Sequence, residues 1–311
     1  MPTTNPVQVL EHFTLVAPLG LRFHDAATGE LVGDGLNVTV YPIKNTLQRV
    51  EARANRSGTY VLHHAPGLRE FERGAGDEEF WNNLPPTQTF VVEVIDQERR
   101  FQPFSFEAEL PAPRGLFNWL SPVEPSPPAG ARSLPLYSAP ARKVSSGMAV
   151  VRADLWDAQA SAPAAWAVVE ARLNNQLQAR GMSDERGRLA LIFPYPKPTD
   201  APLSSPVASP PVNKNVPLLE QTWELALTAG YAPEDLATAA KPPVIPDLRT
   251  TLDQLNAPPA RLWADLAGQD ELLSVTLKYG QELILKSQDS TNVSPPAPQS
   301  VLFITPAGSP P

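Results

Sequence analysis

Many short stretches of this chain alternate apolar and polar residues with a period of two. Val, Ile, Thr and aromatic residues are concentrated there, and turns containing Gly, Asn or Asp separate the stretches. This period is that of a strand with one buried face. The pattern predicts strands at residues 36–41, 49–54, 58–63, 89–95, 149–154, 164–173, 177–181, 189–194, 222–228, 272–279, 282–286 and 301–305. Helix is expected only in short pieces, at 233–239 and at 247–255 with Asp247 as N-cap.

The chain also resembles itself. Residues 54–62 match residues 183–191, each with an Asx residue, two spacers, a glycine and then alternating apolar positions. From Gly58 to Gly187 the offset is 129 residues. The same offset aligns 21–25 with 150–154 and 38–41 with 167–170. A constant offset across three strand-like patches indicates a duplicated unit, so we predict two tandem antiparallel β-sandwiches, Ig-like or transthyretin-like.

Proline sets the expected domain boundaries. It makes up 37 of 311 residues, more than twice the usual share of roughly 5%. Proline-rich segments at 111–128, 197–217 and 294–311 are stiff and extended, and we expect them to adopt fixed structure only in an assembly. The predicted division is an N-terminal arm at 1–15, a first sandwich at 16–110, a linker at 111–133, a second sandwich at 134–293 with an inserted loop at 197–217 and short helices within 233–255, and a C-terminal arm at 294–311.

Four large apolar residues stand close together in the linker: Leu116, Phe117, Trp119 and Leu120. A linker that meets only solvent rarely carries so much apolar surface. Two interpretations remain open. The segment either folds back and fills the gap between the sandwiches, or anchors on a neighbouring subunit, because interface cores favour Trp and Phe.

Two further places are candidate partner contacts. Val301, Leu302, Phe303 and Ile304 form a strand-like run between prolines, with the length to add a strand to a partner's sheet. Trp81 follows an acidic stretch and is expected in a loop, where it is the first candidate for a ligand or partner contact. Both assignments predict that the protein binds a ligand or partner without catalysing a reaction.

Composition disfavours several classes of partner. The net charge is −8 and no segment concentrates Lys and Arg, so nucleic acid is not expected as a partner. No apolar run approaches the roughly 18 residues of a membrane span, so no membrane insertion is expected. The first twenty residues lack a basic start and an unbroken apolar stretch, which predicts synthesis in the cytoplasm without a Sec signal.

Catalytic and cofactor motifs are also missing from the sequence. Cysteine is absent, and His63 and His64 are neighbours that a regular strand would turn to opposite faces. His24 beside Asp25 lacks an evident third partner. Paired carboxylates fall in acidic turns, and no phosphate loop, dinucleotide fingerprint or nucleophile elbow occurs. We therefore expect a non-enzymatic protein with no cofactor and no metal.

The strand and turn phrases of the first half resemble a known family. Residues 29–35, 38–40, 55–60, 66–67 and 90–94 look like the carboxypeptidase regulatory-like fold. That resemblance implies a seven-stranded, transthyretin-like β-sandwich without catalytic residues of its own.

A second resemblance covers about residues 20–196. Residues 21–25, 138–144, 151–157, 165–170 and 183–196 are similar to a protein of phage-tail-like contractile injection systems. It implies a structural subunit at a cap-adaptor or baseplate position, present in multiple copies of a symmetric particle, with sheath, tube, cap or baseplate proteins as partners. The resemblance also implies that the chain is incorporated into a particle that stays in the cytoplasm or is released from the cell. The alternative is a surface- or carbohydrate-binding module of a tail fibre.

Overall fold

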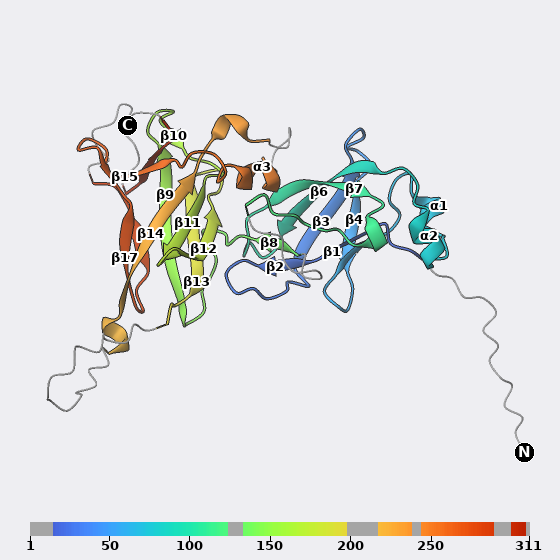
Figure 1. Ribbon diagram of the computed structural model, residues 1–311, viewed down its shortest axis with the longest axis horizontal. Helices are drawn as coiled ribbons and strands as arrows, with labels where there is room; N and C mark the ends of the chain where they lie inside the picture. The colour runs from blue at the N-terminus through green and yellow to red at the C-terminus, as the bar shows by residue number, and fades with distance from the viewer. Residues whose placement is uncertain (1–14, 124–132, 198–216, 238–243, 289–299, 309–311) are drawn as a thin grey trace, which may run out of the picture.

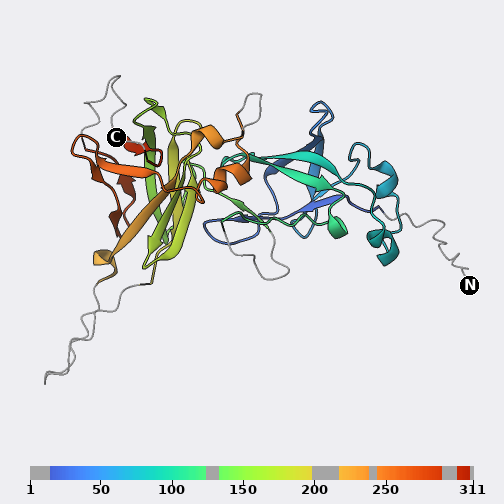
Figure 2. The same cartoon turned by 45° about the horizontal axis from the view of Figure 1, so that its top comes forward.

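The structure is a computed structural model that describes residues 15–123, 133–197, 217–237, 244–288 and 300–308. Within these ranges the protein is all-β, as the alternating pattern predicts, and its α-helices are short. Two sheet-built bodies lie side by side along the long axis (Figure 1). Figure 2 shows the same separation after rotation, so the arrangement does not depend on the view.

The first body is built on one six-stranded sheet. Its order is β1 (Leu19–Leu21), β5 (Tyr60–Leu62), β4 (Val50–Ala54), β3 (Leu36–Pro42), β6 (Gln88–Asp96) and β7 (Phe104–Leu110). Helices α1 (Arg69–Glu72) and α2 (Glu78–Asn82) lie at the end of this body that is far from the second body (Figure 1). The inward residues of the central strands, such as Val38, Val92 and Phe106, are at most 1% exposed and form the core.

A short parallel pair completes the first body. In it β2 (Phe23–Asp25) lies beside β8 (Leu134–Leu136), with Phe23 opposite Leu134. Residues 134–136 therefore belong to the first sandwich, which corrects the expected start of the second sandwich at residue 134. The reason is long-range pairing: all three residues of β8 are buried against the first core.

The second body has two facing sheets. One has the order β12 (Gln176–Met182), β11 (Val168–Leu173), β14 (Thr222–Gly230) and β17 (Ser274–Lys278). The other is centred on β9 (Met148–Asp157), which contacts β10 (Ala162–Pro163), β13 (Arg188–Pro194), β18 (Leu283–Leu285) and β19 (Leu302–Thr305); β15 (Arg261–Asp265) and β16 (Asp270–Glu271) extend it beyond β19. A second core lies between the two sheets, with Val151, Val169 and Leu225 fully buried.

The two bodies share a set of strand pairings, although the β4–β5 pair that joins the first body into one sheet has no counterpart in the second. In the first, β3 pairs with β4 and β6, β6 with β7, and β1 with β5. In the second, β11 pairs with β12 and β14, β14 with β17, and β9 with β13. All these pairs are antiparallel. The predicted duplication is thus present in the fold.

The predicted Asx turns also match in atomic detail. Asn55 Oδ1 accepts from the N–H groups of Ser57 (2.9 Å) and Thr59 (3.1 Å). Asp184 Oδ1 accepts from the N–H groups two and four residues later, each at 2.9 Å. Gly58 and Gly187 close the two turns with φ of +73° and +75°, a conformation that favours glycine.

Candidate functional site

The two sandwiches meet at a junction that has both apolar contacts and hydrogen bonds. Helix α3 (Leu248–Asp253) lies there, between the two bodies (Figure 1). Leu248 and Leu252 are 0% and 1% exposed and belong to the same core as Phe106 of the first sandwich. From the strand region of the second sandwich, Val168 and Met182 join that core. The apolar core of the first sandwich therefore extends to residues of the second sandwich, which keeps a separate core between its own two sheets.

Local sequence explains why α3 presents this face. Asp247 Oδ1 accepts from Thr250 N–H at 2.8 Å and starts the helix, as predicted from its N-cap position. Leu248 and Leu252 are four residues apart, so they share one helix face. That face is the one buried at the junction.

Hydrogen bonds cross the same junction. Ser105 N–H donates to Pro246 O at 2.8 Å. The Gln102 side-chain amide donates to Met182 O at 3.3 Å. Buried backbone groups are costly to leave unpaired, so these bonds fix the relative placement of the sandwiches as well as satisfying the groups.

A buried arginine adds an electrostatic tie. Arg180 of β12 is bonded to Glu170 at 2.7 Å, and Glu170 also bonds Arg172 at 2.7 Å. Burial lowers the pKa of Arg180, but its hydrogen bonds with Tyr137 and Glu170 and the negative charge of Glu170 outweigh burial and raise that pKa. Tyr137 follows β8 and belongs to the first body. Arg180 therefore stays charged between the two sandwiches.

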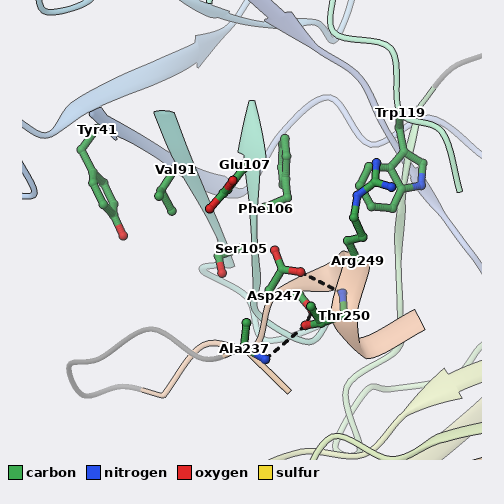
Figure 3. A pocket seen from close by; sticks show the side chains of 10 residues that line it. All are labelled: Tyr41, Val91, Ser105, Phe106, Glu107, Trp119, Ala237, Asp247, Arg249 and Thr250. Carbon is green, nitrogen blue, oxygen red and sulfur yellow. Dashed lines mark hydrogen bonds between the residues drawn. The ribbon is translucent and has the colours of Figure 1, made fainter. Parts of the chain in front are cut away.

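A cleft of about 400 Å³ opens beside the junction. Figure 3 shows strand residues of the first sandwich on one side and α3 on the other. It is lined by Tyr41, Val91, Ser105, Phe106, Glu107, Trp119, Ala237, Asp247, Arg249 and Thr250. The Arg249 guanidinium lies 5.6 Å from the centre of the Trp119 ring. Within the described ranges neither Arg249 nor Glu107 has an ion-pair partner.

Most polar groups of the cleft already serve the fold. The Asp247 carboxylate caps α3, and the Ser105 hydroxyl donates to Pro246 O at 3.3 Å. The Tyr41 hydroxyl donates to Glu93 Oε1 at 2.6 Å. These bonds hold the lining side chains in place, so we interpret the cleft as part of the contact between the two sandwiches. Among the described residues, no group of three or more His, Asp or Glu side chains is placed to hold a metal ion.

Glu93 is the centre of a buried polar cluster next to this cleft. It is 6% exposed and accepts two hydrogen bonds from the Arg49 guanidinium, at 2.6 and 3.1 Å. The Arg49 guanidinium also lies 4.4 Å from the centre of the Tyr41 ring. Burial, and then the hydrogen bond to the Glu93 carboxylate, raises the pKa of Tyr41 to about 12.

The raised pKa of Tyr41 predicts a loss of stability at high pH. The ordinary value is 10.0, so the folded state favours the neutral phenol. The stabilisation that this provides is fully present below pH 10 and is lost as pH rises to about 12, by about 2–3 kcal/mol. Chemical denaturation between pH 10 and 12 measures it. Tyr41→Phe is expected to unfold with a shallower pH dependence; equal slopes in both proteins would contradict the assignment.

The linker residues are divided between core and surface. Phe117 and Trp119 pack against Phe106, with ring centres 5.0 and 6.2 Å apart. Trp119 is 5% exposed, whereas Leu116 and Leu120 are 44% and 48% exposed. The segment therefore folds back onto the protein, which is the first of the two interpretations above.

Trp81 lies on helix α2, which corrects the expected loop. Asp77 Oδ1 caps this helix by accepting from Phe80 N–H at 2.8 Å. The Trp81 indole N–H donates to Gly76 O at 3.1 Å, and its ring contacts Phe71 and Phe80. Trp81 is thus a half-buried part of the α1–α2 end rather than a free contact residue.

Val301, Leu302, Phe303 and Ile304 are buried within their own chain. Each is at most 3% exposed. Strand β19 runs parallel to β9 and antiparallel to β15, so its hydrogen-bonding edges are both occupied. This corrects the prediction of an arm that adds to a partner's sheet. The expectation that proline-rich segments gain structure only in an assembly is likewise wrong for 112–119 and 301–305; residues 124–128, 198–216 and 294–299 lie outside the described residues.

Sequence reasoning missed which strand edges the chain itself covers. The edge of β1 is covered where Phe117 N–H donates to Gly20 O at 3.0 Å. Pro246 covers β7 at Ser105, and Gln102 covers β12 at Met182. The outer edge of β17 has no such cover among the described residues. The pattern at 272–279 predicts a strand but carries no signal for its place in the sheet.

Comparisons with known proteins add no family. No protein-family model and no curated protein matches the sequence. Two solved structures of variants of the shaft pilin SpaA from Lactobacillus rhamnosus GG align with 94% and 96% of this chain and with the whole pilin chain in each case. The identity is 9% in both, and the TM-scores are 0.21 and 0.22. Alignments of this quality do not carry an argument about fold or function. No described helix has the length and apolar character to cross a membrane.

Proposed function

We propose that this chain is a non-enzymatic structural subunit of a phage-tail-like contractile injection particle. In that role it connects neighbouring subunits at a cap-adaptor or baseplate position. Its partners are other particle proteins, and it is present in multiple copies. It needs no cofactor.

The observation that carries the proposal is the shared core at the junction. Domains joined only by a linker move relative to one another by default. Here Leu248 and Leu252 bury a helix face between the sandwiches, and Ser105 is bonded across the junction. A rigid double sandwich holds surfaces at its two ends at a fixed spacing, which is what a connecting subunit must do. The sequence resemblance over residues 20–196 supplies the type of particle.

Removal of the chain from a particle-producing strain tests the role. We expect the tagged chain to co-sediment with sheath and tube, and particles made without it to be incomplete in electron micrographs. Intact particles that fail to attach to cells would instead favour the surface- or carbohydrate-binding module of a tail fibre. A chain that never co-sediments with particles would contradict both.

A further inference from the structure

In the part of the chain that the structure describes, no strand covers the outer edge of β17. Tyr279 N–H donates to Gln221 O at 3.0 Å. Leu227 N–H donates to Leu273 O, also at 3.0 Å, at the other end of the pairing. In an antiparallel pair, hydrogen-bonded and non-hydrogen-bonded residues alternate, so the odd-numbered residues of β17 turn their backbone groups toward β14. The even-numbered residues turn theirs outward, and all of these are exposed: Ser274, Thr276 and Lys278.

An exposed leucine accompanies this edge. Leu273, immediately before β17, is 67% exposed. Natural proteins usually protect edge strands, as this chain does at β1, β7 and β12. An edge that the described residues leave uncovered, with an exposed leucine beside it, is the geometry that accepts an added strand.

The first residues of the chain have the pattern of a matching strand. Residues 7–14 lie outside the described residues, and their sequence places Val7, Val9, Glu11 and Phe13 at alternate positions, so three of these four residues are apolar. The described chain starts at Leu15, which is 56% exposed, and Val16 N–H donates to Glu72 O beside α1. Helices α1 and α2 lie at one end of the long axis and β17 at the other (Figure 1). The described chain thus begins at the end of the molecule opposite the β17 edge.

We propose that the β17 edge of one copy binds residues 7–14 of a second copy as an added strand. The outward N–H and C=O groups of Ser274 and Thr276 and the N–H group of Lys278 supply the hydrogen bonds, whereas Lys278 O already accepts from Gln281 N–H at 3.3 Å. An apolar residue of the added strand covers Leu273. Because donor and acceptor lie at opposite ends of the protein, the contact is head-to-tail and forms open chains of copies or closed rings.

Two variants of the full chain separate donor from acceptor. Thr276→Pro removes one outward N–H and places a ring at the edge, where proline leaves the backbone hydrogen bonds to β14 intact; it also removes the exposed hydroxyl that donates to Glu224 Oε1. Val9→Asp puts a charge on the apolar face of the donor. Each variant alone is expected to associate at least about tenfold more weakly than the unchanged chain in sedimentation experiments. Mixed together they are expected to form one-to-one pairs, since each keeps the half that the other lacks.

Leu47→Asp is the matched control. Leu47 is 86% exposed on the first sandwich, away from both proposed halves, so this variant is expected to associate like the unchanged chain. Hydrogen exchange provides a second measurement that needs no substitution. The amides of Ser274, Thr276 and Lys278 are expected to gain protection as the protein concentration rises.

Three outcomes would overturn the proposal. They are an unchanged chain that stays monomeric at every concentration, a Thr276→Pro chain that associates normally, and β17 amides protected equally at all concentrations because the same chain covers them. The proposal goes beyond the structural role and needs only purified protein. Its failure would therefore leave the particle experiment unaffected.

Discussion

Replacing Leu248 by alanine is expected to lower the free energy of unfolding by about 2–5 kcal/mol and to split unfolding into two transitions. The side chain is fully buried on α3 between the two sandwiches. Its removal leaves a cavity at the junction, so each sandwich loses part of the surface that couples it to the other. Urea denaturation followed both by tryptophan fluorescence and by circular dichroism measures the effect, because two transitions make the probes disagree.

Arg249→Ala on the same helix is the control for this variant. Its guanidinium lies over Trp119 at the cleft, an arrangement worth about 0.5–1 kcal/mol at an accessible site. We expect a loss of that size and a single transition. If Leu248→Ala behaved like Arg249→Ala, the junction would not couple the sandwiches.

Gly187→Ala is expected to destabilise the second sandwich by about 2–5 kcal/mol. A Cβ at this position would lie 2.2 Å from Leu155 O and 3.2 Å from Ala164 N, both backbone atoms that cannot move aside cheaply. The backbone is also left-handed there, with φ of +75°, which costs a non-glycine residue about 1–2 kcal/mol. Overpacking adds typically 1–3 kcal/mol. Thermal unfolding of the variant measures the sum.

Gly29 offers a matched control for the steric part. Its φ is also +75°, but a Cβ there meets no atom within 4 Å. Gly29→Ala should therefore cost only the backbone term of about 1–2 kcal/mol. The difference between the two variants isolates the contact with Leu155. Equal losses would show that the tight turn at Gly187 has room for a side chain.

Local chemistry is what the sequence predicted well. The period of two identifies the strands because it follows from one buried face, and it holds at Val38 and Val92. The turns at Asn55 and Asp184 were predictable because their hydrogen bonds lie within four residues. The duplication was predictable because both halves of the sequence contain the same alternating strands and the same Asx turn.

Placement within the sheets was not predictable to the same degree. Residues 134–136 pair with β2, more than a hundred positions earlier, and no local pattern reports that partner. The run 301–304 carried a signal that was misinterpreted: four consecutive apolar residues are typical of a strand buried on both faces, whereas an edge strand alternates. The flanking prolines favoured an extended arm, but the structure buries Phe303 in a strand of its own chain.

The candidate site was harder to predict still. Trp119 and Phe117 were identified as apolar residues that need cover, and they find it against Phe106. The junction depends on α3, whose six residues pack against strands of the first sandwich that are distant in the sequence, and no local pattern reports that contact. The open edge of β17 is likewise a property of the assembled sheets.

The distance between two labels, one on each sandwich, tests the central claim most directly. The chain has no cysteine, so Glu51→Cys on β4 and Ala226→Cys on β14 place spin labels only at two exposed strand positions. If the sandwiches are one rigid body, the distance distribution is narrow and has a single peak, and Leu248→Ala broadens it. A broad distribution in the otherwise unchanged chain would contradict the rigid double sandwich and, with it, the connecting role.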